Sequence, residues 1–482
     1  MSFYLDEKIK TIFPEESIYK KPGGDSRFSG LNLPSFIKDW LIKKFTDIND
    51  NIDAEGLSIF LEEHLPGKNS NIRGRLLQHE TLTILARILI EVDIKDGIYK
   101  FGLPDLGIRT NEGQISPSVI RANPSLGEGE TWGIVTLEYI EKDEESKQYR
   151  GYVQMNGFQP FKPYNPNFEY YKEARGEFST QEWIDFIIAN MEYNPQSESF
   201  DSIDTKLLFI SRLLVFVEPN LNLIELAPKG TGKSYIFLNL SKYGWQISGG
   251  KITRAKLFYN MASQTPGIIS NYDFVSMDEV KTITFENPSE LQGALKNYLE
   301  SGTFTVGKSK QDSSCGLILL GNIDLTSDKR PVNNKYFIEL PEVFHDTALI
   351  DRFHGFLEGW KLPRLNKGLF FEGYSLNVEY FSEVLSEMRR DPIYMSVAND
   401  LLIFPSNSDA RDTKAIKRLC SAYLKLLFPN VKNSSDISPE DFYNYCFVPS
   451  YEKRAIIRKQ LSLMDPEFGT TMPDVKVRGY ND

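Results

Sequence analysis

Residues 227–234 read Ala227-Pro228-Lys229-Gly230-Thr231-Gly232-Lys233-Ser234, and this stretch decides the fold of the chain. It follows the apolar run 221–226, which predicts a buried parallel strand, and precedes the apolar run 235–240, which predicts a helix. Strand, glycine-rich turn, Lys-Ser and helix are the parts of a P-loop, where backbone N–H groups and the Lys bind phosphates and the Ser hydroxyl binds Mg²⁺. We therefore predict that residues 227–234 bind a nucleoside triphosphate. An ordinary glycine-rich turn is the alternative, and Ala227 stands where the motif usually has Gly.

The composition indicates a globular protein of several domains. The chain has 482 residues, enough for roughly three domains of about 150 residues, with 41% hydrophobic and 25% charged residues. None of its apolar runs approaches the roughly 18 residues that span a bilayer. Its three cysteines are widely spaced, which favours a reducing compartment over a disulfide framework or a zinc site. We therefore expect a cytoplasmic protein that does not bind membranes.

The net charge of −11 bears on nucleic-acid binding. It argues against a surface that binds DNA over its whole area. Net charge averages over the surface, whereas phosphate contacts are local, so a basic pore inside an acidic exterior stays open.

The pattern along the chain predicts four parts. Residues 1–95 are expected to be mainly helical, with one helix after Pro34 and another carrying Leu76, Leu77, Leu82, Leu85, Ile88 and Leu89. Residues 96–165 hold short β-branched and aromatic segments that predict a small β domain. Strands and helices alternate over 180–360, as in an α/β nucleotide-binding core, and helical periodicity returns over 361–482.

Two further strand ends carry polar residues after the P-loop. The strand at 272–279 ends in Asp278 and Glu279, which we predict to hold Mg²⁺ and to activate the attacking water, respectively. The strand at 316–320 is followed by Asn322, whose side chain would orient that water against the γ-phosphate. Acidic pairs at strand ends are common, and an Asn there often serves only as a loop or helix cap.

Two arginines are candidates for contacts with phosphate. Arg352, near the end of a predicted helix, suits an arginine finger that reaches the nucleotide of a neighbouring subunit; a structural pair with Asp351 is the alternative. Arg411 opens a later helix and would reach back to the phosphates of its own subunit. Arg418 competes with it for that role, and a surface salt bridge is a further alternative.

These motifs together resemble the AAA+ ATPases and, within them, the Lon-like BrxL proteins of BREX phage-defence systems. The most specific parts of the resemblance are the segments 225–234, 248–251, 275–280 and 349–355. Ala227 fits that family better than a generic AAA+ protein. Familiar members carry a further C-terminal domain resembling the Lon protease, with a Ser–Lys dyad. Since this chain stops at Asp482, we expect a short form without that domain and without peptidase activity.

The resemblance also implies the architecture of minichromosome maintenance helicases. It implies an N-terminal helical and OB-like β domain, then an AAA+ core with a helical lid, assembled as a hexameric ring, or two stacked rings, around a channel. Residues 299–310 read as a β-hairpin, and in such helicases a hairpin here projects into the channel. Lysines at a hairpin tip are often merely solvated, but here we expect contact with the DNA backbone from Lys251, Arg254, Lys308 and Lys310.

We therefore predict an ATP-hydrolysing, ring-forming, DNA-binding motor in antiviral defence. Its cofactors would be ATP and Mg²⁺, and its partners double-stranded DNA, further copies of the chain and other BREX-type proteins. A protein unfoldase is one alternative, although unfoldase pore loops usually present an aromatic residue and the hairpin offers only Phe304. The other alternative is a nucleotide-gated scaffold that clamps DNA without translocating.

Overall fold

The chain forms two compact units in the computed structural model. One unit combines Met1–Asp39 with Pro166–Asp482, and the other is Trp40–Asn165. The structure describes residues 3–21, 28, 31, 33–47, 51–65, 70–94, 96–123, 126, 129–141, 151–160, 166–261, 265–480 and 482. The predicted boundary at residue 165 lies outside the described residues.

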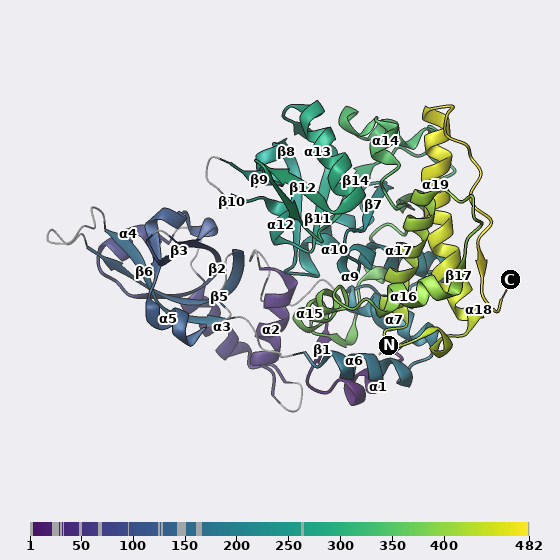
Figure 1. The fold of residues 1–482 in the computed structure, drawn as a ribbon. Helices are drawn as coiled ribbons and strands as arrows, with labels where there is room; N and C mark the ends of the chain where they lie inside the picture. Colours follow the sequence, from purple (N-terminus) through teal and green to yellow (C-terminus); the bar gives the residue numbers. More distant parts are fainter. Residues whose placement is uncertain are drawn as a thin grey trace. The chain divides into compact units, whose positions relative to one another are not determined.

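A five-stranded parallel sheet forms the centre of the first unit (Figure 1). Its order is β15-β7-β14-β11-β8, with β15 at Gly355–Glu358, β7 at Asn222–Ala227, β14 at Gly316–Asn322, β11 at Phe274–Phe285 and β8 at Gly244–Ile252. Every residue of β7 is buried, as expected for a strand covered on both faces of a parallel sheet. The predicted strands before the P-loop, at 272–279 and at 316–320 are therefore confirmed.

Helices and small hairpins surround this sheet. They are α9 (Leu214–Val217), α10 (Lys233–Asn239), α11 (Arg254–Leu257), α12 (Ile268–Asn271), α13 (Pro288–Ser301), α14 (Thr347–Ile350) and the two-stranded pair β9 (Tyr259–Asn260) and β10 (Thr265–Pro266). Pro288 stands at the first helical position of α13, and Gly302 ends the helix in the left-handed conformation. The chain then turns directly into β12 (Thr303–Val306) and β13 (Ser309–Asp312), so the predicted hairpin is confirmed.

Helices from both ends of the chain complete the first unit. The N-terminal side contributes α1 (Asp6–Ile12), β1 (Ser17–Lys20), α6 (Phe168–Ala174), α7 (Thr180–Asn190) and α8 (Ile203–Ile210). The C-terminal side contributes β16 (Gly373–Leu376), α15 (Val378–Met388), α16 (Ile393–Leu401), β17 (Leu402–Ile403), α17 (Ala410–Leu427), α18 (Pro439–Asp441), α19 (Val448–Met464) and β18 (Lys476–Val477). Strand β1 pairs with β16, which joins the chain's start to its C-terminal third, and α17 packs beside α19 (Figure 1).

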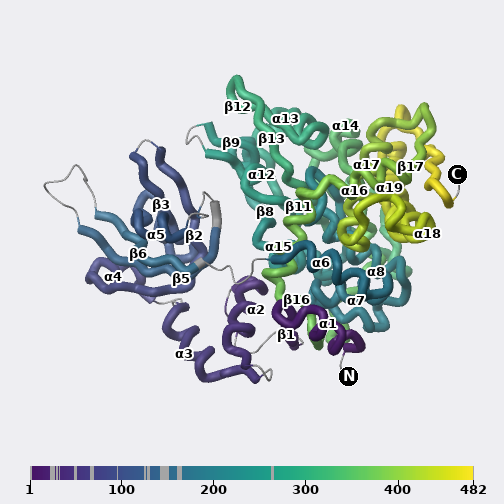
Figure 2. Tube along the Cα trace, turned by 60° about the horizontal axis from the view of Figure 1, so that its bottom comes forward, coloured from purple at the N-terminus to yellow at the C-terminus, as the bar shows by residue number. Residues whose placement is uncertain are grey.

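The second unit is built on a closed β-barrel of five strands (Figure 2). Its order is β2-β3-β4-β6-β5, with β2 at Leu82–Asp93, β3 at Ile98–Gly102, β4 at Gly113–Ile115, β6 at Tyr152–Pro160 and β5 at Gly129–Ile140. Helix α2 (Ser35–Lys44) crosses the boundary between the units, and α3 (Ala54–His64), α4 (Ile72–Leu77) and α5 (Pro117–Ala122) belong to the second. The small β domain predicted after residue 96 is therefore present, but it begins earlier.

The helix predicted through Leu82, Leu85 and Leu89 is wrong, because these residues lie in strand β2. The even-numbered side chains from Leu82 to Ile90 point into the barrel core, which is the period of a strand. Extra apolar residues on the other face of the strand made the sequence look helical. The predicted helical domain 1–95 is also divided, since Met1–Asp39 belongs to the first unit and the following residues to the second. Among the described residues, no helix has the length and apolar character needed to cross a membrane.

Candidate functional site: a P-loop at three strand ends

The predicted nucleotide-binding residues meet at one edge of the parallel sheet. Strand β14 pairs with β7 so that Asn322 lies opposite Ala227, where the P-loop begins. Strand β11 lies on the other side of β14, with Met277 opposite Leu319, so Asp278 reaches the same edge. The carboxyl ends of adjacent parallel strands thus bring the P-loop, Asp278 and Asn322 together, at the usual ligand edge of an open α/β sheet.

Lys233 is the central cation of this edge. Its amino group donates a hydrogen bond to Asn322 Oδ1 at 2.8 Å, and its side chain is buried. Burial lowers the pKa of Lys233, and the negative charges of Glu225, Asp278 and Glu279 oppose that effect. Within the described chain no carboxylate lies within ion-pair distance of Lys233, so a buried ammonium has only a neutral amide as its hydrogen-bond partner. Such a group is incompletely compensated, and a phosphate oxygen is the partner that it lacks.

A buried ion pair contacts the backbone of the P-loop. Arg212 binds both carboxylate oxygens of Glu225 on β7, at 3.0 and 2.5 Å. Its remaining nitrogen donates to the backbone oxygen of Thr231 in the P-loop at 2.9 Å. Neither Arg212 nor Glu225 was predicted as part of the site. The sequence did hold a signal for this pair, because Arg212 lies inside the apolar run 207–217 and Glu225 inside the apolar run 221–226. Charged residues in buried segments usually have a partner that is buried with them.

The P-loop backbone takes the shape that its glycines allow. Gly230 and Gly232 have φ values of 81° and 74°, in the left-handed region, where glycine avoids the strain of a side chain. The N–H of Leu365 donates to the backbone oxygen of Gly230 at 2.7 Å. A Cβ at Gly232 would overlap the hydroxyl of Tyr193, which the sequence did not indicate. Residues outside the motif therefore contact the loop at both glycines.

Asp278 and Glu279 are adjacent in sequence but differ in their surroundings. Asp278 is buried and accepts hydrogen bonds from Gln246 Nε2 at 3.1 Å and from the backbone N–H of Glu279 at 2.9 Å. Glu279 is exposed, and its φ of 46° is a strained value for a residue with a side chain. A fixed carboxylate beside an exposed one suits the predicted division between holding a metal and activating water.

The residues present fit a triphosphate with Mg²⁺. Lys233 would bind the β- and γ-phosphates, the backbone of residues 228–232 would surround them, and Ser234 and Asp278 would share the Mg²⁺. The described residues hold no group of three or more His, Cys, Asp or Glu that could bind a metal alone.

Arg352 lies at the opposite end of the sheet from its own P-loop. His354, two residues later, exchanges backbone and ring hydrogen bonds with Asn222, the first residue of β7. The P-loop begins at Ala227, the last residue of β7, which is about 16 Å from Asn222 at the usual rise per residue of a strand. Arg352 itself contacts Glu300, with Nε 3.0 Å from Oε2. The position excludes contact with the chain's own nucleotide, and the role of Arg352 in a neighbouring subunit stays a prediction.

The structure contradicts the predicted role of Arg411 at its own phosphates. Arg411 donates to Asp351 Oδ2 at 2.7 Å and lies 3.4 Å from Glu300 Oε2, at the same end of the sheet as Arg352. The competing Arg418 donates to the backbone oxygen of Asn220 at 2.8 Å, just before β7. Helix α17 therefore begins on the side away from the P-loop, which periodicity alone did not reveal.

The four predicted DNA-binding residues fall into two groups. Lys251 pairs with Glu286 at 2.8 Å, and Arg254 lies 3.3 Å from Glu290 and donates to the backbone oxygen of Thr305. Lys308 and Lys310 are exposed on the β12–β13 hairpin, and no ion pair to either occurs among the described residues. The hairpin's aromatic residue, Phe304, is buried against Phe258 and Tyr298. The tip thus presents lysines and no aromatic ring.

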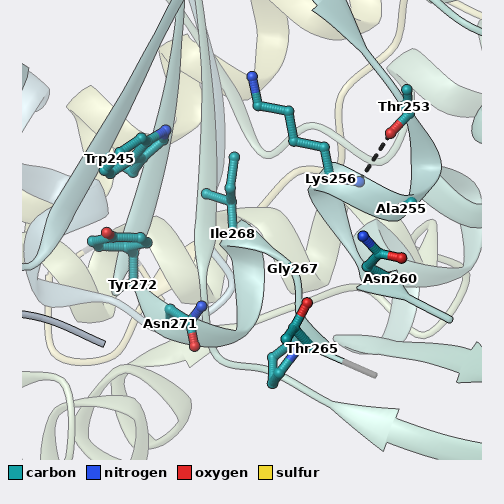
Figure 3. A pocket seen from close by; sticks show the side chains of 11 residues that line it. Trp245, Thr253, Ala255, Lys256, Asn260, Thr265, Gly267, Ile268, Asn271 and Tyr272 are labelled. Atoms are coloured by element: carbon teal, nitrogen blue, oxygen red, sulfur yellow. Dashed lines mark hydrogen bonds between the residues drawn. The ribbon is translucent and has the colours of Figure 1, made fainter. Parts of the chain in front are cut away.

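A separate cavity of about 360 Å³ lies on the first unit, away from the P-loop (Figure 3). Its walls include Trp245 and Tyr272, whose ring centres are 5.1 Å apart, and the turn around Gly267. Trp245 pairs with Val275 in the sheet, towards the amino end of β11. None of the predicted site residues lines this cavity, so we assign nucleotide binding to the P-loop edge on its chemistry.

Comparison with known proteins gives consistent matches over most of the chain. Residues 153–474 match the family described as Lon-like protease BrxL-like, ATPase domain, and residues 11–139 match BREX system Lon protease-like protein BrxL N-terminal. Two similar proteins are the Lon-like protease BrxL of Escherichia coli O9:H4 (strain HS), 28% identical over 438 residues, and that of Bacillus cereus (strain H3081.97), 30% identical over 408. These alignments cover 90% and 83% of this chain but 61% and 59% of the relatives. The chain thus spans about three fifths of their length.

Proposed function

This chain belongs to the BrxL family of Lon-like proteins of BREX systems, and from that premise we propose that it is an ATP-hydrolysing, ring-forming, DNA-binding AAA+ motor of an anti-phage defence system. The observation that carries the proposal is the contact between Lys233 and Asn322, 2.8 Å long, beside Asp278 on the neighbouring strand. These residues come from three separate segments and meet where a triphosphate and its metal would lie. ATP and Mg²⁺ are the proposed cofactors.

In the proposed mechanism, each residue acts on charge or on a proton. Lys233 neutralises phosphate charge, and Asn322 holds both Lys233 and the attacking water in place. Glu279 accepts the proton of that water, while Asp278 and Ser234 would hold Mg²⁺. Arg352 stabilises the transition state of the adjoining subunit, because its position excludes its own. The active site would therefore be complete only in an assembly, for which a hexameric ring is our proposal.

Glu279→Gln tests the hydrolytic half of this proposal. We expect ATP binding to persist while turnover falls by about 100-fold or more, because a general base is lost without a change of shape. Fluorescent-nucleotide titration and phosphate release measure the two quantities. Turnover at the wild-type rate in this variant would contradict the role of Glu279.

Arg352→Ala tests the shared active site. We expect about 1,000-fold slower turnover with unchanged nucleotide binding, as for other trans-acting arginines. Mixing Arg352→Ala with Glu279→Gln subunits should restore part of the activity, since some mixed interfaces then contain both an intact Glu279 and an intact Arg352. Full activity in Arg352→Ala alone would exclude a trans role.

The hairpin supports DNA as the proposed substrate. Burial of Phe304 removes the one aromatic residue that an unfoldase could use there, whereas Lys308 and Lys310 remain available to phosphates. The double variant Lys308→Ala, Lys310→Ala should weaken DNA binding for all sequences and reduce the slope of log affinity against log salt by about 2. The control is Lys335→Ala with Lys367→Ala, which removes the same charge from exposed positions elsewhere.

The barrel of the second unit adds to the likeness with ring helicases. Its strand order, with a helix between the third and fourth strands, is that of a closed Greek-key barrel, and we propose that it is OB-like.

A strand-displacement assay separates a translocating motor from a clamp that only holds DNA. The expectation that this chain has no peptidase activity stays a prediction, which a labelled-casein assay checks.

A further inference from the structure

We propose that Glu300 is a latch that restrains the trans-acting Arg352 and couples it to the β12–β13 hairpin. The inference rests on the proposed function of the site and assigns its regulation to one carboxylate. Glu300 lies in the last turn of α13, three residues before Thr303 begins the hairpin. It also lies beside three cations, Arg352, Arg411 and Lys414, which we call the basic cluster.

The contacts of Glu300 with the basic cluster are specific. Its Oε2 lies 3.0 Å from Arg352 Nε and 3.4 Å from Arg411 Nε, and its Oε1 lies 3.9 Å from Lys414 Nζ. Lys414 also donates a hydrogen bond to the backbone oxygen of Glu300. Side chain and main chain of one residue are thus both held by cations, one from the segment that follows α14 and two from α17.

The basic cluster is incompletely neutralised. Arg411 has a second carboxylate partner in Asp351, which Arg454 also binds, at 2.6 Å. Arg352 has only Glu300 as an ion-pair partner in the described chain, and its Nε, although buried, is not aligned for a hydrogen bond. Its other contact is a hydrogen bond to the backbone oxygen of Ala348. Another anion, such as the γ-phosphate of a neighbouring subunit, can therefore replace Glu300 with little loss.

The same residue is joined to the hairpin by a short connection. Gly302 separates the two elements; its N–H donates to the backbone oxygen of Tyr298, closing the helix. On the other side, Arg254 donates to the backbone oxygen of Thr305 at 2.8 Å. Helix α13 leads straight into β12 and β13 (Figure 2). A force on Lys308 or Lys310 at the tip is thus transmitted to Glu300 over a few residues.

In this proposal the latch is closed without DNA and opens when DNA binds. Without DNA, Glu300 holds Arg352 within its own subunit and away from the neighbour's phosphate. DNA bound at the hairpin displaces the base of the hairpin, weakens the contact of Glu300 with Arg352 and frees the arginine for the transition state. Hydrolysis is therefore slow until the channel is occupied.

Glu300→Gln tests the latch, because glutamine keeps the size of the side chain and removes its charge. We expect turnover without DNA to rise by about fivefold or more, a typical coupling between two sites, and DNA to add little further stimulation. Nucleotide affinity should stay unchanged, since Glu300 lies away from the P-loop. Glu387→Gln is the matched control: Glu387 is a similarly exposed helical carboxylate paired with Arg390 at 3.0 Å.

Three results would overturn the latch. Wild-type basal turnover with full DNA stimulation in Glu300→Gln would show that no coupling passes through the carboxylate. A fall to the level of Arg352→Ala, with the thermal midpoint of the wild type, would show that Glu300 holds Arg352 in its active position. If the turnover of the wild type did not change when DNA was added, the proposed coupling between the hairpin and Arg352 would be wrong, although ATP hydrolysis itself would still be present. Loss of the proposed function itself would show differently, as absent turnover in the wild type.

Discussion

Gly232 is the residue whose replacement has the clearest expected effect. Its φ of 74° strains any residue with a side chain, and an added Cβ would overlap the Tyr193 hydroxyl. We expect Gly232→Ala to abolish ATP binding, measured by fluorescent-nucleotide titration, and to lower the thermal midpoint. Gly176→Ala is the control, because a Cβ there meets no atom within 4 Å and the backbone is not in the left-handed region. Normal ATP binding by Gly232→Ala would contradict the observed loop.

The buried pair of Arg212 and Glu225 gives a second prediction at this scale. Arg212→Met leaves an unpaired buried carboxylate, which should cost about 3–5 kcal/mol of the free energy of unfolding. The double variant Arg212→Met, Glu225→Leu should recover most of that stability, because no charge is left unpaired. ATP affinity should stay low in both, since Thr231 loses its hydrogen-bond donor. Urea unfolding and nucleotide titration measure the two effects, and normal ATP affinity in the double variant would contradict the support role.

The candidate site could be predicted where a rule of sheet geometry applies and not elsewhere. Lys233, Asp278 and Asn322 each follow or end a buried strand, and parallel strands bring such positions to one edge. Arg411 was placed at the wrong end because its position depends on the direction from which α17 enters. That direction is set by contacts of Asp351 and Arg454, which lie far away in sequence. The contact of Tyr193 with Gly232 could not be predicted, because packing between residues that are distant in sequence leaves no motif.

Helix α19 buries Lys453, which has no carboxylate within ion-pair distance in the described part of the chain, and this predicts how the stability of the protein depends on pH. Lys453 donates to the backbone oxygen of Pro449 at 3.2 Å, and its amino group lies 5.3 Å from the centre of the Tyr423 ring. Burial lowers its pKa to about 7, which the charges of Glu452, Glu358 and Asp204 oppose and that of Lys361 reinforces. In the unfolded chain Lys453 keeps a pKa of about 10.4. The unfolded state therefore binds more protons between about pH 7 and pH 10.

This difference in bound protons means that the stability of the folded protein rises with pH over that range. Below about pH 7 the folded protein carries a buried charge that lowers its stability, and this loss is relieved as the pH rises. Lys453→Met, which fills a similar volume without a charge, should raise the thermal midpoint most at pH 6 and least at pH 9. The comparison is made as variant minus wild type at each pH, so that other titrating groups cancel. A difference that does not vary with pH would contradict the lowered pKa.

Strand β2 shows why some elements cannot be assigned from sequence alone. Its barrel-core positions alternate from Leu82 to Ile90, but apolar residues also occur between them and one of these, Leu85, is buried too, so strand and helix patterns both match. Closure of the barrel decides between them, because β2 pairs with β3 on one side and with β5 on the other. By contrast, the hairpin that follows α13 could be predicted, since Gly302 and the alternating β-branched residues after it are typical of a β-hairpin.

At the scale of the whole molecule, separate apolar cores underlie the two units. One core surrounds the parallel sheet and includes Leu226 and Leu319; the other fills the barrel and includes Ile88 and Val135. The chain enters the first unit, leaves it after Asp39 and returns at Pro166. Sequence patterns predicted the change from barrel to α/β core, but they could not show that the first residues return to the later unit. That return depends on the pairing of β1 with β16, more than 350 residues apart.

Separate cores predict separate unfolding transitions, of which nucleotide shifts only one. The proposed site for ATP with Mg²⁺ is the P-loop in the first unit, and ATP at 100 times its dissociation constant should stabilise that unit by about 2.7 kcal/mol. Calorimetry on Glu279→Gln, which should not consume the ATP, should show one transition moving upward and the other unchanged. Lys233→Ala serves as the control, in which neither transition should move. A single transition that shifts as a whole would show instead that the units unfold cooperatively, and nucleotide binding would then stabilise the barrel as well.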